Sequence, residues 1–508
     1  MKTQIRNLGI FLTVCYVILF AQLQRYTVFD AEELQEKPGN NRQEIRDFSA
    51  PRGTIATTDG VLLAKSEKSD DKYKLQRTYP QGDLYAHIVG SFNPLSTGTS
   101  GVEKTYNKQL AGDLGFGLEQ LSNLFSDENQ VGNVTLTIRS DVQQAARDAL
   151  AGKVGSVVAL DPRNGEILAA YSNPTFDPNP LASHDFGAAL KAADDLDKTP
   201  GKPRLARFYR DNLPPGSTFK VITSTAGITY DNVTNEGPEY PEVIEYTPRG
   251  AGASIRNSNG HTCGGTLFTI LARSCNTSYA QMGEEMKGQD LAVTAADFGF
   301  DKDVPIDLPL PAQATMYCKD GSPSGPAELD DPAIRAQEAI GGRCVRATPL
   351  EMALVAAAVA HGGDIMKPHV LKEIRDNDGS KVKGFDEGVW TKAMEAPVAA
   401  ILREAMNGVV EGGTADKLDG ELAPDQWEVG GKTGTAPLGD TGSSHAWIIG
   451  FAGRPGEEPT VAVAAVIEAA PGLGEQFGGQ VAGPVAAHVL HQVLEGSPTP
   501  AENASGDE

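Results

Sequence analysis

Apolar and polar positions follow different periods along the chain, and the first clear feature is an apolar stretch near the N-terminus. Residues 7–24 carry no charge and lie between Arg6 and Arg25. At about 1.5 Å per helical residue, the stretch would span roughly 27 Å, close to the ~30 Å hydrocarbon core of a bilayer. A cleaved signal peptide is the alternative, but no A-x-A-like cleavage site follows. The pattern therefore predicts a cytoplasmic stub and a transmembrane helix within residues 1–30.

The charges on either side of this stretch predict its orientation. Lys2 and Arg6 precede it, whereas acidic residues predominate after it, within residues 30–36. Basic residues flanking a membrane helix tend to stay on the cytoplasmic side. We therefore expect a single-pass protein of the plasma membrane, with its N-terminus in the cytoplasm and its later residues outside.

The apolar positions become strongly patterned after about residue 130. Val134, Leu136 and Ile138 alternate with threonines, which predicts a half-buried strand. Ser140 is predicted to cap a helix over residues 141–151. Turn and capping residues bound the remaining predicted elements. These are a hairpin over 156–160 and 166–171, helices beginning at Pro215, Thr266, Gln289, Thr348 and Pro397, strands over 429–436, 445–452 and 460–468, and a helix over 480–494.

The order of these elements predicts the fold class and the domains. Strands at both ends with helices between them indicate one mostly antiparallel sheet, assembled from both ends of a domain, with an inserted helical subdomain. This is an α/β arrangement. We expect a polar N-terminal domain over residues 31–150, a catalytic domain over 151–495, and a disordered acidic tail over 496–508.

Composition narrows the class of partner. The 508 residues include 44 Lys and Arg against 67 Asp and Glu, a net charge of −23. Apolar residues make up 40% and charged residues 22%, which is typical of a globular protein. Because so acidic a chain has little to offer a phosphate backbone, we expect no nucleic-acid partner.

The five cysteines give a hypothesis about disulfides and argue against a metal site. Cys15 lies in the predicted anchor, and the other four admit three pairings. If the domain lies in an oxidising compartment, Cys263 could pair with Cys275 and Cys318 with Cys344. Four buried free cysteines are the alternative. There is no C-x-x-C or Cys/His cluster with zinc spacing, so no metal is expected.

One apparent motif match is incomplete, whereas a second one fits the sequence. Residues 431–433 resemble the end of a phosphate-binding loop, but that loop needs glycine where Gln426 stands, and the segment continues as a strand. A nucleotide cofactor is therefore not expected. The same segment also fits a serine acyltransferase that uses an S-x-x-K motif.

The S-x-x-K motif of Ser217 and Lys220 has a suitable context. The same motif at Ser69 and Ser380 lies in charged, loop-like segments. Residues 213–216 instead break the structure before a buried helix, which would place Ser217 on a first turn with free backbone N–H groups. Lys220 would then lie on the same face, within reach of the hydroxyl.

Lysine as a base requires a lowered pKa. At an ordinary pKa of about 10.4, well under ~0.1% of lysine side chains are neutral at pH 7. Burial, a helix N-terminus and a second cation would each lower that value, and a depression of three units is equivalent to about 4 kcal/mol. Lys432 is the obvious second cation for Lys220.

Two further motifs complete a set. The S-x-N motif at 274–276 lies inside a helix predicted over 266–286, and the K-T-G motif at 432–434 lies on a strand before Thr435. Without a side chain, Gly434 would let an extended peptide lie against that strand. Each motif alone is more often structural than catalytic. All three in chain order on suitable elements are hard to explain by chance.

At these residues the chain resembles the class B penicillin-binding proteins, the monofunctional D,D-transpeptidases, and most resembles their actinobacterial penicillin-binding protein A type. The resemblance covers roughly residues 45 to 495. It implies a penicillin-binding, serine β-lactamase-like transpeptidase domain with helices on both faces of its sheet, preceded by a pedestal domain. Similar segments also occur at 51–55, 101–103, 136–138, 159–162, 165–169, 348–353 and 445–447.

The resemblance implies a role for each residue of the first two motifs. Ser217 would attack the D-Ala–D-Ala carbonyl of a peptidoglycan stem peptide and expel the terminal D-Ala. Lys220 would take the hydroxyl proton. Ser274 would relay a proton to the leaving amine, and Asn276 would position Lys220 and the substrate amide.

It also implies roles for the third motif. Lys432 would supply electrostatic field and hold the relay, while Thr433, Gly434 and Thr435 would bind the substrate, the two threonines through its carboxylate. Backbone N–H groups of Ser217 and Thr435 would form the oxyanion hole. A second stem peptide would then attack the acyl-enzyme without a cofactor, and β-lactams would act as covalent inhibitors.

Some features depart from the family or leave alternatives. The usual Ile-Gly-Gln stretch is replaced at 340–343, which puts the role of that loop in doubt, and His445 is expected to be a packed strand residue. A glycosyltransferase domain does not fit before residue 134, so a membrane glycosyltransferase partner is expected to polymerise the glycan. A carboxypeptidase or β-lactamase on the same scaffold, and a catalytically silent cell-wall scaffold, are the alternatives.

Overall fold

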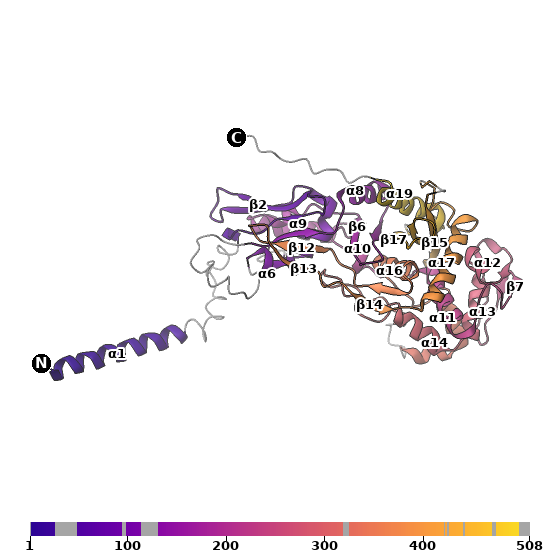
Figure 1. Cartoon of the computed structure of the whole chain (residues 1–508), viewed down its shortest axis with the longest axis horizontal. Coiled ribbons are helices and arrows are strands. Elements are labelled where there is room, and N and C mark those ends of the chain that lie inside the picture. The colour runs from indigo at the N-terminus through magenta and orange to yellow at the C-terminus, as the bar shows by residue number, and fades with distance from the viewer. Residues whose placement is uncertain are drawn as a thin grey trace. The chain divides into compact units, whose positions relative to one another are not determined.

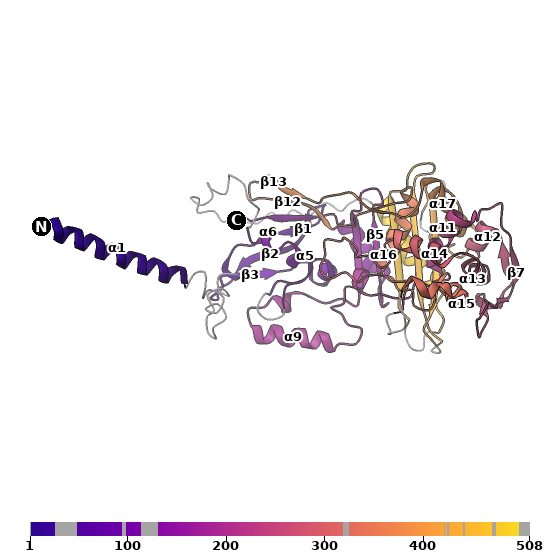
Figure 2. The same ribbon diagram turned by 90° about the horizontal axis from the view of Figure 1, so that it is seen from below.

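The computed structural model divides the chain into two compact units. They are Met1–Pro51 with Ser66–Gln76, and Arg52–Lys65 with Arg77–Glu508. Figures 1 and 2 show the ribbon in two views. The tail predicted beyond residue 496 lies outside the described residues. The structure describes residues 2–25, 48–93, 98–112, 131–318, 325–420, 422–423, 426–439, 442–469 and 474–496.

The predicted anchor is a helix. α1 (Lys2–Gln24) contains one window, Arg6–Gln24, that is long and apolar enough to cross a membrane, with a mean hydropathy of 1.6. None of this window is buried inside the protein. An apolar helix of this length that is not buried in the protein can be buried in the hydrocarbon core of a bilayer.

The catalytic domain is built on a five-stranded antiparallel sheet. Its strand order is β15-β16-β17-β5-β6, so strands from both ends of the domain form one sheet, as predicted. Both faces of β16 and β17 are buried, which explains their nearly continuous apolar sequence. The strands are β5 (Gly155–Leu160), β6 (Ile167–Asn173), β15 (Glu428–Pro437), β16 (Ser444–Gly453) and β17 (Val461–Ile467).

Helices cover both faces of this sheet. α8 (Ser140–Ala149) and α19 (Gly483–Leu494) lie on one side, and α16 (Pro349–Ala360) lies on the other (Figure 1). Every residue of α16 is buried. Thr348 caps it by accepting a hydrogen bond from the Glu351 N–H at 3.1 Å.

Two predicted helix ends were wrong. Arg139, not Ser140, is the N-cap of α8, and the Ser140 hydroxyl instead donates to Asp59. The last helix is divided into α18 (Gly478–Val481) and α19, because Pro484 lacks the N–H that a continuous helix would need there.

The inserted subdomain is mainly helical, as predicted. α17 packs on β15, and α13 packs on α15. Between β6 and β15 the chain forms the helices α9 (Phe186–Lys198), α10 (Arg207–Arg210), α11 (Lys220–Asp231), α12 (Leu267–Ala272), α13 (Asn276–Glu285), α14 (Gly288–Asp297), α15 (Pro332–Glu338) and α17 (Ala396–Glu411), in addition to α16, and the short strands β7 (Tyr240–Val243), β8 (Glu245–Tyr246), β9 (Ile255–Arg256), β10 (Cys263–Gly265), β11 (Asp364–Met366) and β14 (Val389–Lys392).

A second sheet joins segments that are far apart in the chain. Its order is β13-β12-β4-β1-β2-β3, and β12 pairs with β4. Two strands from beyond residue 370 therefore complete the N-terminal sheet, and the boundary at residue 150 stays a prediction. The strands are β1 (Ile55–Ala56), β2 (Leu62–Lys68), β3 (Leu75–Thr78), β4 (Asn133–Leu136), β12 (Leu371–Arg375) and β13 (Lys381–Gly384).

A buried charge cluster lies in the N-terminal region. Glu103 is completely buried between Arg52 and Arg77, with N–O distances of 2.6 Å and 2.7 Å. Burial alone would raise the pKa of the Glu103 carboxyl, but Arg77 and Arg52 outweigh it and hold that pKa below its usual value. The cluster is therefore ionised and paired.

Candidate active site

Ser217 lies on a tight turn before α11. The turn, η4 (Gly216–Phe219), is a 3₁₀-helix where an α-helix was predicted. Residues three apart are eclipsed in a 3₁₀-helix, so Ser217 and Lys220 lie on one side, as predicted. Gly216 has φ +54°, and a Cβ there would lie 2.7 Å from the carbonyl oxygen of Thr435. The Ser217 hydroxyl has no hydrogen bond to any described residue.

The S-x-N motif interrupts a helix. The prediction of one helix over residues 266–286 was wrong, because α12 ends at Ala272 and α13 begins at Asn276. Ser274 between them has φ +57°, a left-handed conformation that stops the α-helix. The break directs both the carbonyl and the hydroxyl of Ser274 to the Lys220 amine.

The four cysteines outside the predicted anchor form two disulfides. Cys263 is bonded to Cys275, next to Ser274, and Cys318 is bonded to Cys344. The pairing hypothesis is confirmed, and the alternative of four free cysteines is wrong.

Lys220 is fully buried among oxygen atoms. Its Nζ lies 2.8 Å from the Ser274 carbonyl oxygen, 3.3 Å from the Ser274 Oγ and 2.6 Å from the Asn276 Oδ1. Asn276 is held in turn by donating its Nδ2–H to the Arg256 carbonyl at 2.9 Å. Lys220 forms no ion pair with any carboxylate of the described residues.

Lys432 reaches the same hydroxyl from the sheet. It is fully buried on β15, and its Nζ lies 2.9 Å from the Ser274 Oγ and 3.0 Å from the Thr433 carbonyl oxygen. Ser274 thus joins the two lysines, although they are far apart in the sequence.

The surroundings of both lysines lower their pKa values. Burial, followed by the charge of Lys432, holds the pKa of Lys220 well below its usual value. Burial lowers the pKa of Lys432 to about 7. Both shifts have the sign expected of buried amines that lack a carboxylate. These surroundings therefore favour the neutral form of the Lys220 amine.

Strand β15 carries the third motif along one edge of the sheet. The Thr433 hydroxyl is hydrogen-bonded to that of Thr414 at 2.7 Å. A Cβ on Gly434 would lie 2.5 Å from the Pro215 carbonyl oxygen and 3.0 Å from Thr218 Cγ2. The observed role of Gly434 is therefore to let the turn that carries Ser217 approach β15, which was not anticipated.

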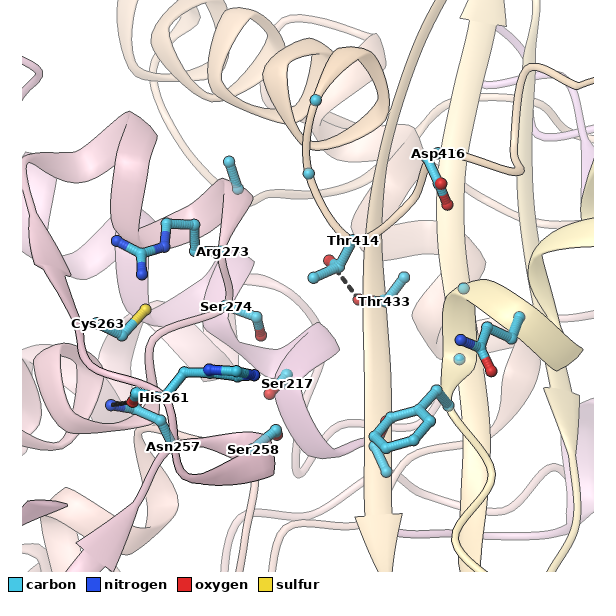
Figure 3. A pocket seen from close by; sticks show the side chains of 18 of the residues that line it. Ser217, Asn257, Ser258, His261, Cys263, Arg273, Ser274, Thr414, Asp416 and Thr433 are labelled. Carbon is cyan, nitrogen blue, oxygen red and sulfur yellow. Dashed lines mark hydrogen bonds between the residues drawn. The ribbon is translucent and has the colours of Figure 1, made fainter. Parts of the chain in front are cut away.

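These residues border an open cleft of about 480 Å³. Figure 3 shows Ser217, Ser274 and Thr433 with their side chains around it. Thr435 also lines the cleft, whereas Lys220 and Lys432 are fully buried and connect with it through Ser274.

Sequence reasoning missed several residues of the site. Thr414 lines the cleft and contacts Thr433, but the sequence around it carries no motif that we used. Gly341, in the loop whose role was in doubt, has φ +72°, and a Cβ there would collide with the Gly216 carbonyl. Its glycine is thus needed for packing against the serine turn. His445 is buried and accepts a hydrogen bond from the Ala469 N–H at 3.1 Å, as expected of a packed strand residue.

No cluster of three or more His, Cys, Asp or Glu side chains suited to a metal ion occurs in the described part of the chain.

Two family models match most of the chain. A model described as penicillin binding protein transpeptidase domain matches residues 155–491, and one described as penicillin binding protein A dimerisation domain matches residues 52–134.

Relatives of known name match over nearly their full length. The chain is 33% identical to the peptidoglycan D,D-transpeptidase PbpA of Mycolicibacterium smegmatis, over 98% of this chain and 100% of that protein. It is 32% identical to PbpA of Mycobacterium tuberculosis with the same coverage. A solved structure of M. tuberculosis penicillin-binding protein A, a ceftriaxone acyl-enzyme complex, superposes with a TM-score of 0.78 at 31% identity, covering 89% of this chain and 100% of that one.

Proposed function

The chain belongs to the penicillin-binding proteins with a transpeptidase domain, and we propose that Ser217 is the nucleophile of its reaction. It is a serine-type peptidoglycan D,D-transpeptidase, an enzyme that cross-links stem peptides and that β-lactams acylate. Its substrate is thus a peptide that ends in D-Ala–D-Ala.

The first half of the reaction forms an ester. The Ser217 Oγ attacks the carbonyl carbon of the penultimate D-Ala, and the neutral amine of Lys220 takes the hydroxyl proton. The backbone N–H groups of Ser217 and Thr435 bind the resulting oxyanion. The tetrahedral intermediate collapses when the C–N bond to the terminal D-Ala breaks.

Ser274 carries the proton to the leaving amine. Its hydroxyl contacts both lysines, so it can donate a proton to the amine and recover one from Lys220. Asn276 positions Lys220, and the field of Lys432 favours the neutral form of that base. The observation that carries the proposal is this shared Ser274 contact between two buried lysines, neither of which has a carboxylate partner among the described residues.

Strand β15 carries the residues that would bind the substrate carboxylate. Thr433 and Thr435 line the cleft beside Ser217, and Thr414 orients the Thr433 hydroxyl. With Gly434 they form the edge strand against which an extended peptide can lie. The hydroxyls would bind the carboxylate of the terminal D-Ala.

The second half of the reaction closes the cross-link. The amine of a neighbouring stem peptide attacks the ester carbonyl, and the Ser217 oxygen recovers a proton as it leaves. One amide is exchanged for another, so the bond energy comes from the substrate.

An N-terminal membrane anchor with its N-terminus in the cytoplasm would put this reaction outside the cell. Lys2 and Arg6, at the start of α1 and before its uncharged stretch, support an N-terminus in the cytoplasm and a catalytic domain beyond the membrane. A membrane glycosyltransferase would supply the glycan strands whose peptides are joined. Co-purification of such a polymerase with the full chain from membranes would test this assembly.

Labelling with penicillin tests the nucleophile. The full chain in detergent should form a covalent adduct with fluorescent penicillin, and Ser217→Ala should abolish it. Ser380→Ala is the matched control, because Ser380 belongs to an S-x-x-K motif outside the cleft. Peptide mapping should place the adduct on the peptide that contains Ser217. Undiminished labelling of Ser217→Ala would contradict the proposal.

A further inference from the structure

A second cavity adjoins the serine turn. It has a volume of about 470 Å³ and shares Ser258 and Thr435 with the first cleft. Gly216 and Asn276 also line it, next to the end of β15. The turn that carries Ser217 is thus bordered by two cavities, of which the mechanism above uses only the first.

The proposed reaction indicates which part of the substrate each of the two cavities would bind. Ser274, which would protonate the leaving amine, and Thr433, which would bind the leaving carboxylate, line the first cleft and not the second. The departing D-Ala therefore occupies the first cleft. The acyl part of the donor peptide must extend the other way, past Thr435 along the edge of β15. That path leads into the second cavity, which residues 436–439 line.

The second cavity contains an arginine without an ion pair. Arg346 is half-buried, and its Nη1–H groups donate to the carbonyl oxygens of Arg343 at 3.0 Å and Val345 at 2.8 Å. A guanidinium has five N–H donors, so three remain available to a ligand. Arg346 forms no salt bridge with any described carboxylate.

Arg346 differs from the other charged residues that line the second cavity. Arg343 lines the same cavity, but its Nη1 is already paired with Glu328 at 2.9 Å and Glu338 at 3.0 Å. Glu475 also lines the cavity, and it is exposed to solvent. An unpaired guanidinium in a protein of net charge −23 is a specific place for an anion.

We propose that the second cavity binds the acyl arm of the donor stem peptide and that Arg346 binds a free carboxylate on that arm. The inference rests on the proposed function, because the direction of the peptide follows from the roles of Ser274 and Thr433. In an extended peptide, the carboxylate could belong to the residue directly before the D-Ala–D-Ala pair or to the residue before that. Arg346 is then a specificity-determining residue, and amidated donors are poorer substrates.

Matched donor peptides test this inference. Three pentapeptides ending in D-Ala–D-Ala would carry free carboxylates, an amide at the third residue, or an amide at the second residue. The release of D-Ala by the full chain in detergent gives kcat/KM for each. We expect one of the two amides to lower kcat/KM about tenfold, the size of one charge-assisted hydrogen bond, and the position of that amide identifies the carboxylate.

Substitution of Arg346 should remove the preference. In Arg346→Gln, the free and amidated donors should react at the same rate, within about twofold, whereas acylation by benzylpenicillin stays unchanged because its neutral side chain offers this cavity no carboxylate. Arg210→Gln, an exposed arginine that lines neither cavity, should keep the wild-type preference.

Specific results would overturn the inference. A wild-type enzyme indifferent to both amides would do so, as would Arg346→Gln that retains the preference. An equal loss of benzylpenicillin acylation in Arg346→Gln would show that Arg346 only supports the fold. Failure of the proposed function looks different, because neither D-Ala release nor the penicillin adduct would then depend on Ser217.

Discussion

Two buried clusters of basic side chains in this protein have opposite chemistry. In the N-terminal region, Arg52 and Arg77 enclose the carboxylate of Glu103 at 2.6 Å and 2.7 Å. In the catalytic domain, Lys220 and Lys432 enclose the neutral hydroxyl of Ser274 at 3.3 Å and 2.9 Å. All four basic side chains are almost or completely buried.

The difference lies in the group between the cations. A carboxylate compensates the arginines, so the cluster stays ionised and holds segments together. A hydroxyl compensates nothing, so the lysines lower their pKa values instead, and a buried amine becomes a base. Arginine suits the first role because it stays protonated, and lysine suits the second because it can lose its proton.

The largest expected effect is the loss of the base. Lys220→Met should lower the rate of acylation by benzylpenicillin about a thousandfold, within the range of general-base contributions. The fold should persist, because a buried amine that forms no ion pair with a described carboxylate is replaced by an apolar side chain of similar length. Stopped-flow acylation and circular dichroism measure the two effects. Lys383→Met, on the exposed strand β13, is the control. Acylation within tenfold of wild type would contradict the role of Lys220.

Removal of the central carboxylate should damage the other cluster differently. Glu103→Gln leaves two buried arginines without a counter-charge, which should lower the free energy of unfolding by about 3–5 kcal/mol. Acylation by the protein that remains folded should not change. Urea denaturation measures the first effect and active-site titration the second. Glu245→Gln removes an exposed ion pair with Arg256 and should cost about 1 kcal/mol or less.

The two clusters should also respond to pH, in different pH ranges but both with a stability that increases as the pH rises. The pKa of Lys432 is lowered to about 7 on folding, so burial of its charge penalises the folded state below pH 7 and the penalty fades towards pH 10. As the pH rises from 7 to 9, the free energy of unfolding of the wild type should therefore increase relative to that of Lys432→Met.

The pKa of Glu103 is lowered on folding, so its stabilising contribution is present above the ordinary pKa of the carboxyl. The deficit of Glu103→Gln should shrink as the pH falls into the acid range. Denaturant titrations at several pH values test both trends, and a pH-independent gap for either variant would refute the corresponding assignment.

The smallest expected effect concerns the hydroxyl that joins the lysines. Cys275, bonded to Cys263, directly follows Ser274. Replacing this disulfide with two serines should loosen the left-handed turn and lower benzylpenicillin acylation several-fold, a displacement effect weaker than loss of the base. The arginine cluster should be unaffected. Replacing Cys318 and Cys344 in the same way is the control. Unchanged acylation would show that the turn holds without its disulfide.

Much of the site could be predicted because its reactive residues belong to short motifs whose members are only a few positions apart in the sequence. The spacing of three positions from Ser217 to Lys220 puts both on one side of a turn, and the apolar runs of β16 and β17 required a buried sheet. The pattern did not reveal that Ser274 breaks a helix, because a left-handed serine has no apolar signature. Nor did it reveal that β12 would join β4, since pairing across such a separation depends on the whole fold.

The sequence by itself determined the apolar N-terminal helix, the alternating and apolar strands, and the order of the three motifs, because each depends on neighbours a few residues away. Only the tertiary structure decided which carboxylates the basic residues would meet. It placed Glu103 between two arginines, and it left Lys220, Lys432 and Arg346 without a carboxylate partner in the part of the chain that the structure describes. Charge compensation acts over a few ångströms in space, and residues that distant in the chain come within this range only when the sheet and its helices have packed.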